Sequence, residues 1–167
     1  MALCDACHGA GGLSQTAGTP SIAGQPKLFL ETQLVLFREQ IRLSPPMQAA
    51  VSGLTDKEIT RLAEYYAAQP ARPVADGAAD AKQIGQATAF AQKQHCGSCH
   101  LPDYRGRQQI PRLAGQREEY LVKALRDFKS GARTGGGVAA MPGVAYRLTA
   151  DDIAAVAHYL ARLPAPP

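Results

Sequence analysis

Cys4-Asp5-Ala6-Cys7-His8 and Cys96-Gly97-Ser98-Cys99-His100 are two copies of one five-residue pattern, and they contain every cysteine of this 167-residue chain. C-x-x-C-H is the pattern at which haem c is attached, because the two sulfurs form thioethers with the porphyrin and the adjoining histidine ligates the iron. Two copies therefore predict two covalently bound haem c groups. The expected thioether residues are Cys4, Cys7, Cys96 and Cys99, and the expected iron ligands are His8 and His100.

Met47 and Met141 are the only methionines after Met1, and they follow His8 and His100 by 39 and 41 residues. A thioether is a soft ligand that suits low-spin haem iron. A single methionine is usually core filler, but the matched spacing favours Met47 and Met141 as sixth ligands of the two irons.

Three other uses of the cysteines are disfavoured. Zinc ribbons place their Cys pairs about 15 to 20 residues apart, whereas Cys7 and Cys96 are 89 positions apart. A thioredoxin-like motif needs a βαβ context, and the sequence shows no such alternation. Structural disulfides would leave the histidine after each pair unexplained.

The sequence repeats beyond the two motifs, which indicates a duplicated domain. Segment 20–25 (PSIAGQ) matches segment 111–116 (PRLAGQ), and Leu-Thr lies seven residues past each internal methionine. Prolines and small residues at 69–77 predict an exposed connector. We therefore expect a first domain at 1–72 and a second at 73–167. Domains of this size bury little apolar surface, so each should need its covalently bound haem for stability.

Apolar residues recur at helical spacing in both halves. The expected stripes are Leu30, Leu34, Phe37 and Ile41; Leu121, Leu125 and Phe128; Ile59, Leu62, Ala63 and Tyr66; and Ile153, Val156, Ala157 and Leu160. The last helix of each half begins with a capping-box pattern, at Thr55 with Glu58 and more weakly at Thr149 with Asp152. A further helix is expected at about 78–93, and no apolar run approaches the roughly 20 residues of a membrane span.

The chain resembles the dihaem cytochromes c of the cytochrome c4 family in the order of its motifs. Each of its two C-x-x-C-H motifs is followed by P-x-[IL]-A-G-Q, an amphipathic helix, a Met-bearing loop and a Leu-Thr-capped helix. The resemblance covers nearly the whole chain. It implies an all-α fold of two tandem class I cytochrome c domains related by a pseudo-twofold axis. It also implies a bacterial periplasmic electron carrier with the cysteine, histidine and methionine assignments given above.

In class I cytochromes a proline carbonyl about a dozen residues past the motif accepts a hydrogen bond from the second nitrogen of the ligand histidine. Pro20 follows His8 by 12 residues, and Pro111 follows His100 by 11. We expect these two prolines to orient the rings and strengthen their donation to iron. The alternative is that either proline merely shapes a turn.

The sequence departs from the family pattern at two places. Only three residues precede Cys4, so the first domain lacks its N-terminal helix and no signal sequence is present, which we interpret as trimming by processing, cloning or a late start assignment. The loops before the methionines also differ, because Ser44-Pro45-Pro46 stiffens the first and Gly135-Gly136-Gly137 loosens the second. This contrast motivates the hypothesis that Met141 is a labile ligand, with a peroxidase-like side activity at the second haem. The alternative is a surface loop that still delivers a firm ligand.

The net charge of +4 lies entirely in the second half, because residues 1–72 carry six basic and six acidic side chains and residues 73–167 carry twelve and eight. Haem propionates would offset this excess, so the charge does not predict nucleic-acid binding. The basic residues between the second motif and Met141 either rim the second haem and steer an acidic partner or form an ordinary solvated face. They are Arg105, Arg107, Arg112, Arg117, Lys123, Arg126, Lys129 and Arg133.

An iron held by histidine and methionine has no open position for a substrate, and methionine ligation raises its reduction potential. The sequence therefore predicts an electron carrier rather than an enzyme. The expected partners are redox proteins, such as a membrane-bound respiratory complex or terminal oxidase reached by peripheral association, and the carrier is expected to be a monomer. The alternative is the cytochrome subunit of a dehydrogenase, such as a flavocytochrome that oxidises sulfide. His95 and His158 are expected to be structural or exposed.

Overall fold

The computed structural model describes residues 1–73, 81–134 and 140–164, apart from the side chains of residues 82 and 83. Within these residues the regular structure is helical, and the only β-pairing is an isolated bridge between Arg107 and Ile110. The first half contains α1 (Ala2–His8), the short 3-10 helix η1 (Ala10–Gly12), α2 (Lys27–Arg38), α3 (Pro45–Val51) and α4 (Asp56–Ala67). The second half contains α5 (Ala81–Lys93), α6 (Cys96–His100), α7 (Glu118–Ser130), α8 (Ala140–Tyr146) and α9 (Ala150–Arg162). The predicted all-α class is confirmed.

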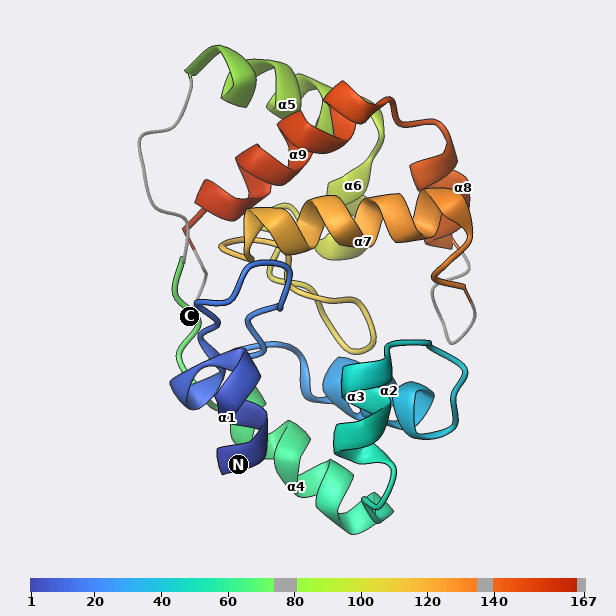
Figure 1. Cartoon of the computed structure of the whole chain (residues 1–167). Coiled ribbons are helices and arrows are strands. Elements are labelled where there is room, and N and C mark those ends of the chain that lie inside the picture. The colour runs from blue at the N-terminus through green and yellow to red at the C-terminus, as the bar shows by residue number, and fades with distance from the viewer. Residues whose placement is uncertain (74–80, 135–139, 165–167) are drawn as a thin grey trace.

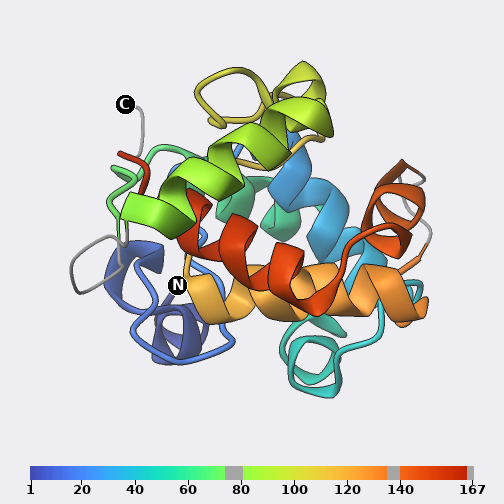
Figure 2. The same ribbon diagram turned by 90° about the horizontal axis from the view of Figure 1, so that it is seen from above.

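The two groups of helices lie one above the other in Figure 1, with α1 to α4 below and α5 to α9 above. In the first half α2 packs on α4, and the core between them consists of Phe29, Leu30, Ala63 and Tyr66. In the second half α9 lies between α5 and α7 and packs on both (Figure 2). Its buried face includes Val156, Ala157, Leu160 and Ala161, which pack with Leu121 of α7.

Both halves repeat the same backbone contacts. The Gly24 N–H donates to the Tyr66 carbonyl at 2.9 Å, and the Gly115 N–H donates to the Leu160 carbonyl at 2.9 Å. In each case the segment after the haem motif is tied to the last helix of its half. The duplication that the sequence indicates is therefore present in the backbone.

The terminal helices begin with complete capping boxes. The Glu58 N–H donates to Thr55 Oγ1 at 3.3 Å, while the Thr55 N–H donates to the Glu58 carboxylate at 2.8 Å. Thr149 and Asp152 make the equivalent pair at 3.1 and 2.8 Å. The aspartate box, which the sequence predicted as the weaker one, is thus formed as fully as the glutamate box.

Two details of the helix predictions need correction. Ile41 is 54% exposed and lies beyond α2, which ends at Arg38, because the chain turns at Gln40 with a φ of 58°. The methionines lie in the short helices α3 and α8 rather than in loops. The helix predicted at about 78–93 is described from Ala81, and residues 78–80 lie outside the described residues.

The described helices contain none that is both long enough and apolar enough to span a bilayer. The predicted division at 72/73 stays a prediction, since the described residues break off at residue 73 and resume at residue 81.

Candidate haem sites

The two motifs form short helices that present their cysteines in the same way. Cys4 and Cys96 are half-buried, whereas Cys7 and Cys99 are exposed, and all four are free thiols. Residues three apart lie on one face of a helix, so each pair can reach one porphyrin edge. Each motif histidine is the last residue of its helix and is only 7% exposed.

The second nitrogen of each motif histidine is held by the expected proline. His8 Nδ1 lies 2.8 Å from the Pro20 carbonyl, and His100 Nδ1 lies 2.9 Å from the Pro111 carbonyl. A carbonyl only accepts hydrogen bonds, so Nδ1 carries the proton and Nε2 keeps its lone pair for a metal. Burial lowers the pKa of both imidazoles, although the bond to the carbonyl partly opposes this effect. Both rings are therefore in the neutral form that binds iron.

The two methionines occupy equivalent elements. Met47 lies in α3, which begins with Pro45 and Pro46 and packs against α2. Met141 lies in α8, which packs against α7. Both side chains are half-buried. The glycines at 135–137, on which the contrast between the two ligands was based, lie outside the described residues.

Two arginines from equivalent positions of the repeat lie beside the core phenylalanines. The Arg42 guanidinium stacks over the Phe37 ring, and that of Arg133 stacks over the Phe128 ring, each at 4.5 Å from the ring centroid. Within the described residues neither forms an ion pair with a carboxylate, and Arg133 Nε has no hydrogen-bond partner. A nearby anion would stabilise the buried Arg133 cation most, since a buried charge without an ion pair is costly.

Gln33 and Tyr120 join these arginines across the interface of the two halves. Gln33 Oε1 accepts from Arg42 at 2.6 Å and from Arg133 at 3.1 Å, and Arg42 also donates to the Tyr120 hydroxyl at 3.2 Å. Burial raises the pKa of Tyr120, but the charges of Arg42 and Arg133 outweigh burial and lower it to about 8. This part of the interface is strongly electropositive.

The residues of the chain fit haem c. The donor set of two haems consists of four free thiols, two thioethers and two imidazoles whose Nε2 atoms make no hydrogen bond within the described residues. The arginines without a carboxylate partner suit a cofactor that carries ionised propionates. When bound, haem supplies one-electron redox chemistry.

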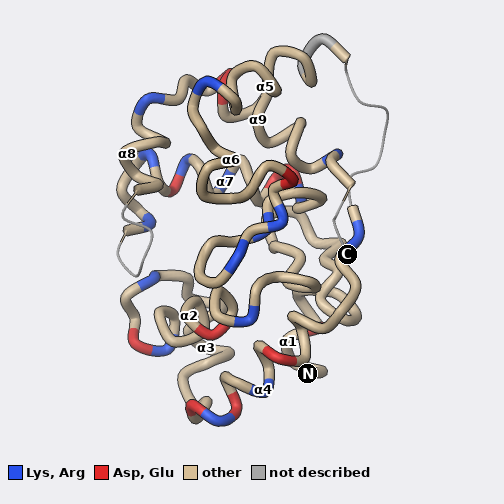
Figure 3. Tube along the Cα trace, turned by 180° about the vertical axis from the view of Figure 1, so that it is seen from behind, with Lys and Arg blue, Asp and Glu red and all other residues tan. Residues whose placement is uncertain are grey.

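Three of the eight basic residues between the second motif and Met141 are buried or nearly so. The interpretation of this group as an ordinary solvated face is therefore wrong for these three. Arg112 is 1% exposed, Arg133 is 7% exposed and the Arg117 side chain is 13% exposed. Figure 3 shows Lys and Arg positions in the middle of the molecule, between the two groups of helices. Burial lowers the pKa of Arg112 to about 10. These side chains hold the two halves together.

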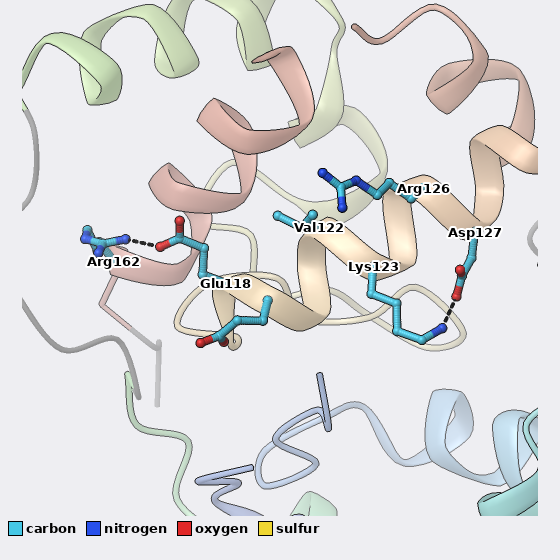
Figure 4. Close-up of a pocket in the computed structure, with 7 residues that line it drawn as sticks. Glu118, Val122, Lys123, Arg126, Asp127 and Arg162 are labelled. Atoms are coloured by element: carbon cyan, nitrogen blue, oxygen red, sulfur yellow. Dashed lines mark hydrogen bonds and ion pairs between the residues drawn. The ribbon is translucent and has the colours of Figure 1, made fainter. Parts of the chain in front are cut away.

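A surface hollow between α7 and the end of α9 is separate from the haem motifs (Figure 4). It is lined by Glu118, Glu119, Val122, Lys123, Arg126, Asp127 and Arg162. Arg162 donates to Glu118 at 2.5 Å, and His158 lies 3.3 Å from the same carboxylate. His158 therefore has a structural contact, as expected, while His95 is exposed and precedes α6 with a φ of 54°.

Comparisons with known proteins agree with this arrangement. The Cytochrome c family matches residues 83–164. Cytochrome c4 of Pseudomonas aeruginosa is 32% identical over 95% of this chain and 83% of that protein. The chain belongs to the cytochrome c4 family.

As a cytochrome c4, the protein is an electron carrier that binds two haem c groups covalently and consists of two class I cytochrome c domains related by a pseudo-twofold axis. The crystal structure of reduced recombinant cytochrome c4 from Pseudomonas stutzeri has a TM-score of 0.87 to this structure at 31% identity, and the match covers 97% of this chain and 94% of that chain. A thiosulfate dehydrogenase electron acceptor of Thiomonas intermedia is 35% identical over 99% of this chain and 81% of that protein.

The sequence interpretation missed the interface residues Gln33, Arg42 and Tyr120. One signal was available, because Arg42 and Arg133 each follow the last phenylalanine of their stripe by five residues. Two arginines at the same repeat position, in halves that differ in charge, indicate a role beyond solubility. Gln33 and Tyr120 have no such signal, since neither occurs in the other copy of the repeat.

Proposed function

We propose that this cytochrome c4 carries electrons in the periplasm between redox proteins and feeds a membrane-bound terminal oxidase, with which it associates peripherally. In this proposal Cys4, Cys7, Cys96 and Cys99 hold the haems. His8 with Met47 and His100 with Met141 ligate the irons, and the domains divide at 72/73. An iron with two protein ligands has no open position, so it exchanges electrons rather than binding a substrate.

The main support for the proposal is the matched hydrogen bond from each motif histidine to a proline carbonyl. A fixed ring loses little energy to reorientation when the iron changes oxidation state, because its position is the same before and after the electron moves. Two such sites in one small protein can store two electrons or relay one electron between an input and an output surface. The relatives named cytochrome c4 support the same role.

A dehydrogenase of sulfur compounds is our proposed electron donor. The supporting observation is the relative named as a thiosulfate dehydrogenase electron acceptor, which matches nearly the whole chain. The alternative in which the chain is a permanent subunit of a sulfide-oxidising flavocytochrome predicts a stable complex, and we favour a carrier that dissociates between its donor and the oxidase.

The test is a stopped-flow experiment with the holoprotein. The oxidised cytochrome is mixed with a thiosulfate dehydrogenase plus thiosulfate, and the reduced cytochrome is mixed with membranes that contain a cytochrome c oxidase. Rapid reduction and rapid reoxidation are expected, with rates that fall as ionic strength rises. Failure of both reactions, or co-elution of the native protein with a flavoprotein on size exclusion, would refute the carrier role.

A further inference from the structure

Two glutamines, Gln25 and Gln116, each bind one backbone segment of the opposite half. Gln116 Oε1 accepts from the Ser21 N–H at 2.8 Å, and its Nε2 donates to the Ser21 carbonyl at 2.8 Å. Gln25 makes the same two bonds to Arg112, at 2.9 and 3.0 Å. All four residues are at most 3% exposed. The two halves therefore hold each other through a reciprocal, solvent-shielded pair of contacts.

Each of these contacts reaches the peptide group that supports a haem ligand. The Ser21 N–H belongs to the same peptide as the Pro20 carbonyl, which lies 2.8 Å from His8 Nδ1. The Arg112 N–H likewise shares its peptide with the Pro111 carbonyl, 2.9 Å from His100 Nδ1. A peptide group is planar and its C–N bond has partial double-bond character, so its N–H and C=O cannot move independently.

We propose that Gln116 is a positioning residue for His8 and that Gln25 is a positioning residue for His100, so that each half sets the strength of the imidazole ligand in the other. This inference rests on the proposed assignment of both histidines as iron ligands. A peptide N–H that donates a hydrogen bond polarises its own carbonyl and makes it a better acceptor. A better acceptor on Nδ1 makes the imidazole a stronger donor at Nε2.

The consequence is a crossed dependence. Removing the glutamine of the second domain weakens the ligand of the first haem, and removing the glutamine of the first domain weakens the ligand of the second. A glutamine that merely stabilised its own domain would act on the haem of that domain. Positioning across the interface and stabilisation of one domain therefore predict a weakened histidine ligand at different irons.

The test measures hydrogen exchange of the His8 and His100 Nδ1–H groups by NMR, in the reduced, ¹⁵N-histidine-labelled holoprotein. In the variant Gln116→Leu we expect exchange at His8 to become about tenfold faster, as expected for the loss of roughly one hydrogen bond. Exchange at His100 should stay within about twofold of the unaltered protein, because Gln25 still bonds both backbone polar groups of Arg112 in this variant. The variant Gln25→Leu should give the opposite pattern.

Two further variants separate positioning from loss of docking. The Arg117 guanidinium donates to the Ser14 carbonyl across the same interface at 3.2 Å, and within the described residues it makes no hydrogen bond to either proline peptide. Arg117→Leu keeps the backbone N–H that donates to Gln116 Oε1, so it should leave both histidines unchanged. Gln116→Glu, studied at a pH low enough to protonate the buried carboxyl, keeps an oxygen that accepts from the Ser21 N–H and gains a hydroxyl that donates to the Ser21 carbonyl, so it should restore slow exchange at His8. The reduction potential of the first haem should rise in Gln116→Leu and return in Gln116→Glu, because a weaker imidazole donor stabilises the ferric state less.

Equal acceleration at both histidines, acceleration only at the histidine of the altered domain, or the same result in Arg117→Leu would overturn the inference. If Gln116→Leu yields no folded holoprotein, Gln25→Leu with Gln25→Glu decides the same question at His100. The ligand assignment fails separately, because it requires low-spin histidine-methionine spectra in the unaltered protein.

Discussion

The substitution Gly106→Ala is predicted to destabilise the second domain through close contacts with three backbone atoms. Gly106 has a φ of 71°, and a Cβ added there would lie 2.4 Å from the Ile110 carbonyl oxygen and 2.4 Å from the Pro111 carbonyl carbon. It would also lie 2.6 Å from the Arg112 nitrogen. Two of these three atoms, the Pro111 carbonyl carbon and the Arg112 nitrogen, belong to the peptide that supports His100, and backbone cannot rotate away as a side chain can.

The magnitude has two parts. An alanine in the left-handed region costs about 1–2 kcal/mol, and overpacking against a fixed neighbour costs a further 1–3 kcal/mol or so. We expect Gly106→Ala to lower the free energy of unfolding by about 2–5 kcal/mol in total. Gly131→Ala is the matched control, because Gly131 has a φ of 77° and nothing within 4 Å of its added Cβ.

The assay is guanidinium unfolding of both holoprotein variants, followed by circular dichroism at a common pH and redox state. In the control Gly131→Ala, the free energy of unfolding should fall only by the cost of placing alanine in the left-handed region, about 1–2 kcal/mol. The Gly106 variant should also show faster exchange of the His100 Nδ1–H, since its peptide is displaced. Equal losses in the two variants, with an unchanged His100, would refute the argument from the close contact.

Three other predictions test separate parts of the molecule. The pKa of Tyr120 in the folded protein, about 8, lies below its ordinary value of 10, so the tyrosinate form stabilises the fold and the free energy of unfolding should rise between pH 8 and 10. Denaturant titrations at several pH values should show no such rise for Tyr120→Phe. The same dependence of the free energy of unfolding on pH in both proteins would contradict the prediction. Thr55→Ala should lower the free energy of unfolding by about 1 kcal/mol through loss of the helix cap, and no change in the denaturant midpoint would count against the capping box. The hypothesis of a labile Met141 predicts that cyanide displaces Met141 before Met47, as followed at the methionine-to-iron charge-transfer band, and equal resistance at both haems would eliminate that hypothesis.

Most of the fold follows from local signals in the sequence. The capping pairs at Thr55 and Thr149 and the stripes behind them appear as predicted because each depends on residues within one helix. Ile41 is a residue for which the apolar period alone gives the wrong structure. The apolar period continues to it, but the Ile41 and Arg42 N–H groups both bond the Leu36 carbonyl and close a turn, which places Ile41 outside the helix.

The interface could not be predicted in the same way, because its contacts join residues about 80 to 100 positions apart. Arg112 and Arg117 have the composition of a solvated basic segment, and only the opposite half supplies the carbonyls of Ala23 and Ser14 to which they donate. The glutamines of the P-x-[IL]-A-G-Q repeat were visible as a repeat. Their partners were not, because a periodicity in one half carries no information about what faces it.

The crossed contacts make docking of the halves and ligation of the irons one linked equilibrium. If docking strengthens the imidazole donors, it favours the ferric state, and linkage requires that oxidation favours docking by the same factor. The interface suits this coupling because each glutamine bonds both polar groups of its target residue, so separation would leave an N–H and a carbonyl without partners on each side. Two haem domains that share a chain but not an interface would have independent reduction potentials. Here each iron is coupled to the opposite half, because the peptide that supports its histidine is bonded by a glutamine of that half.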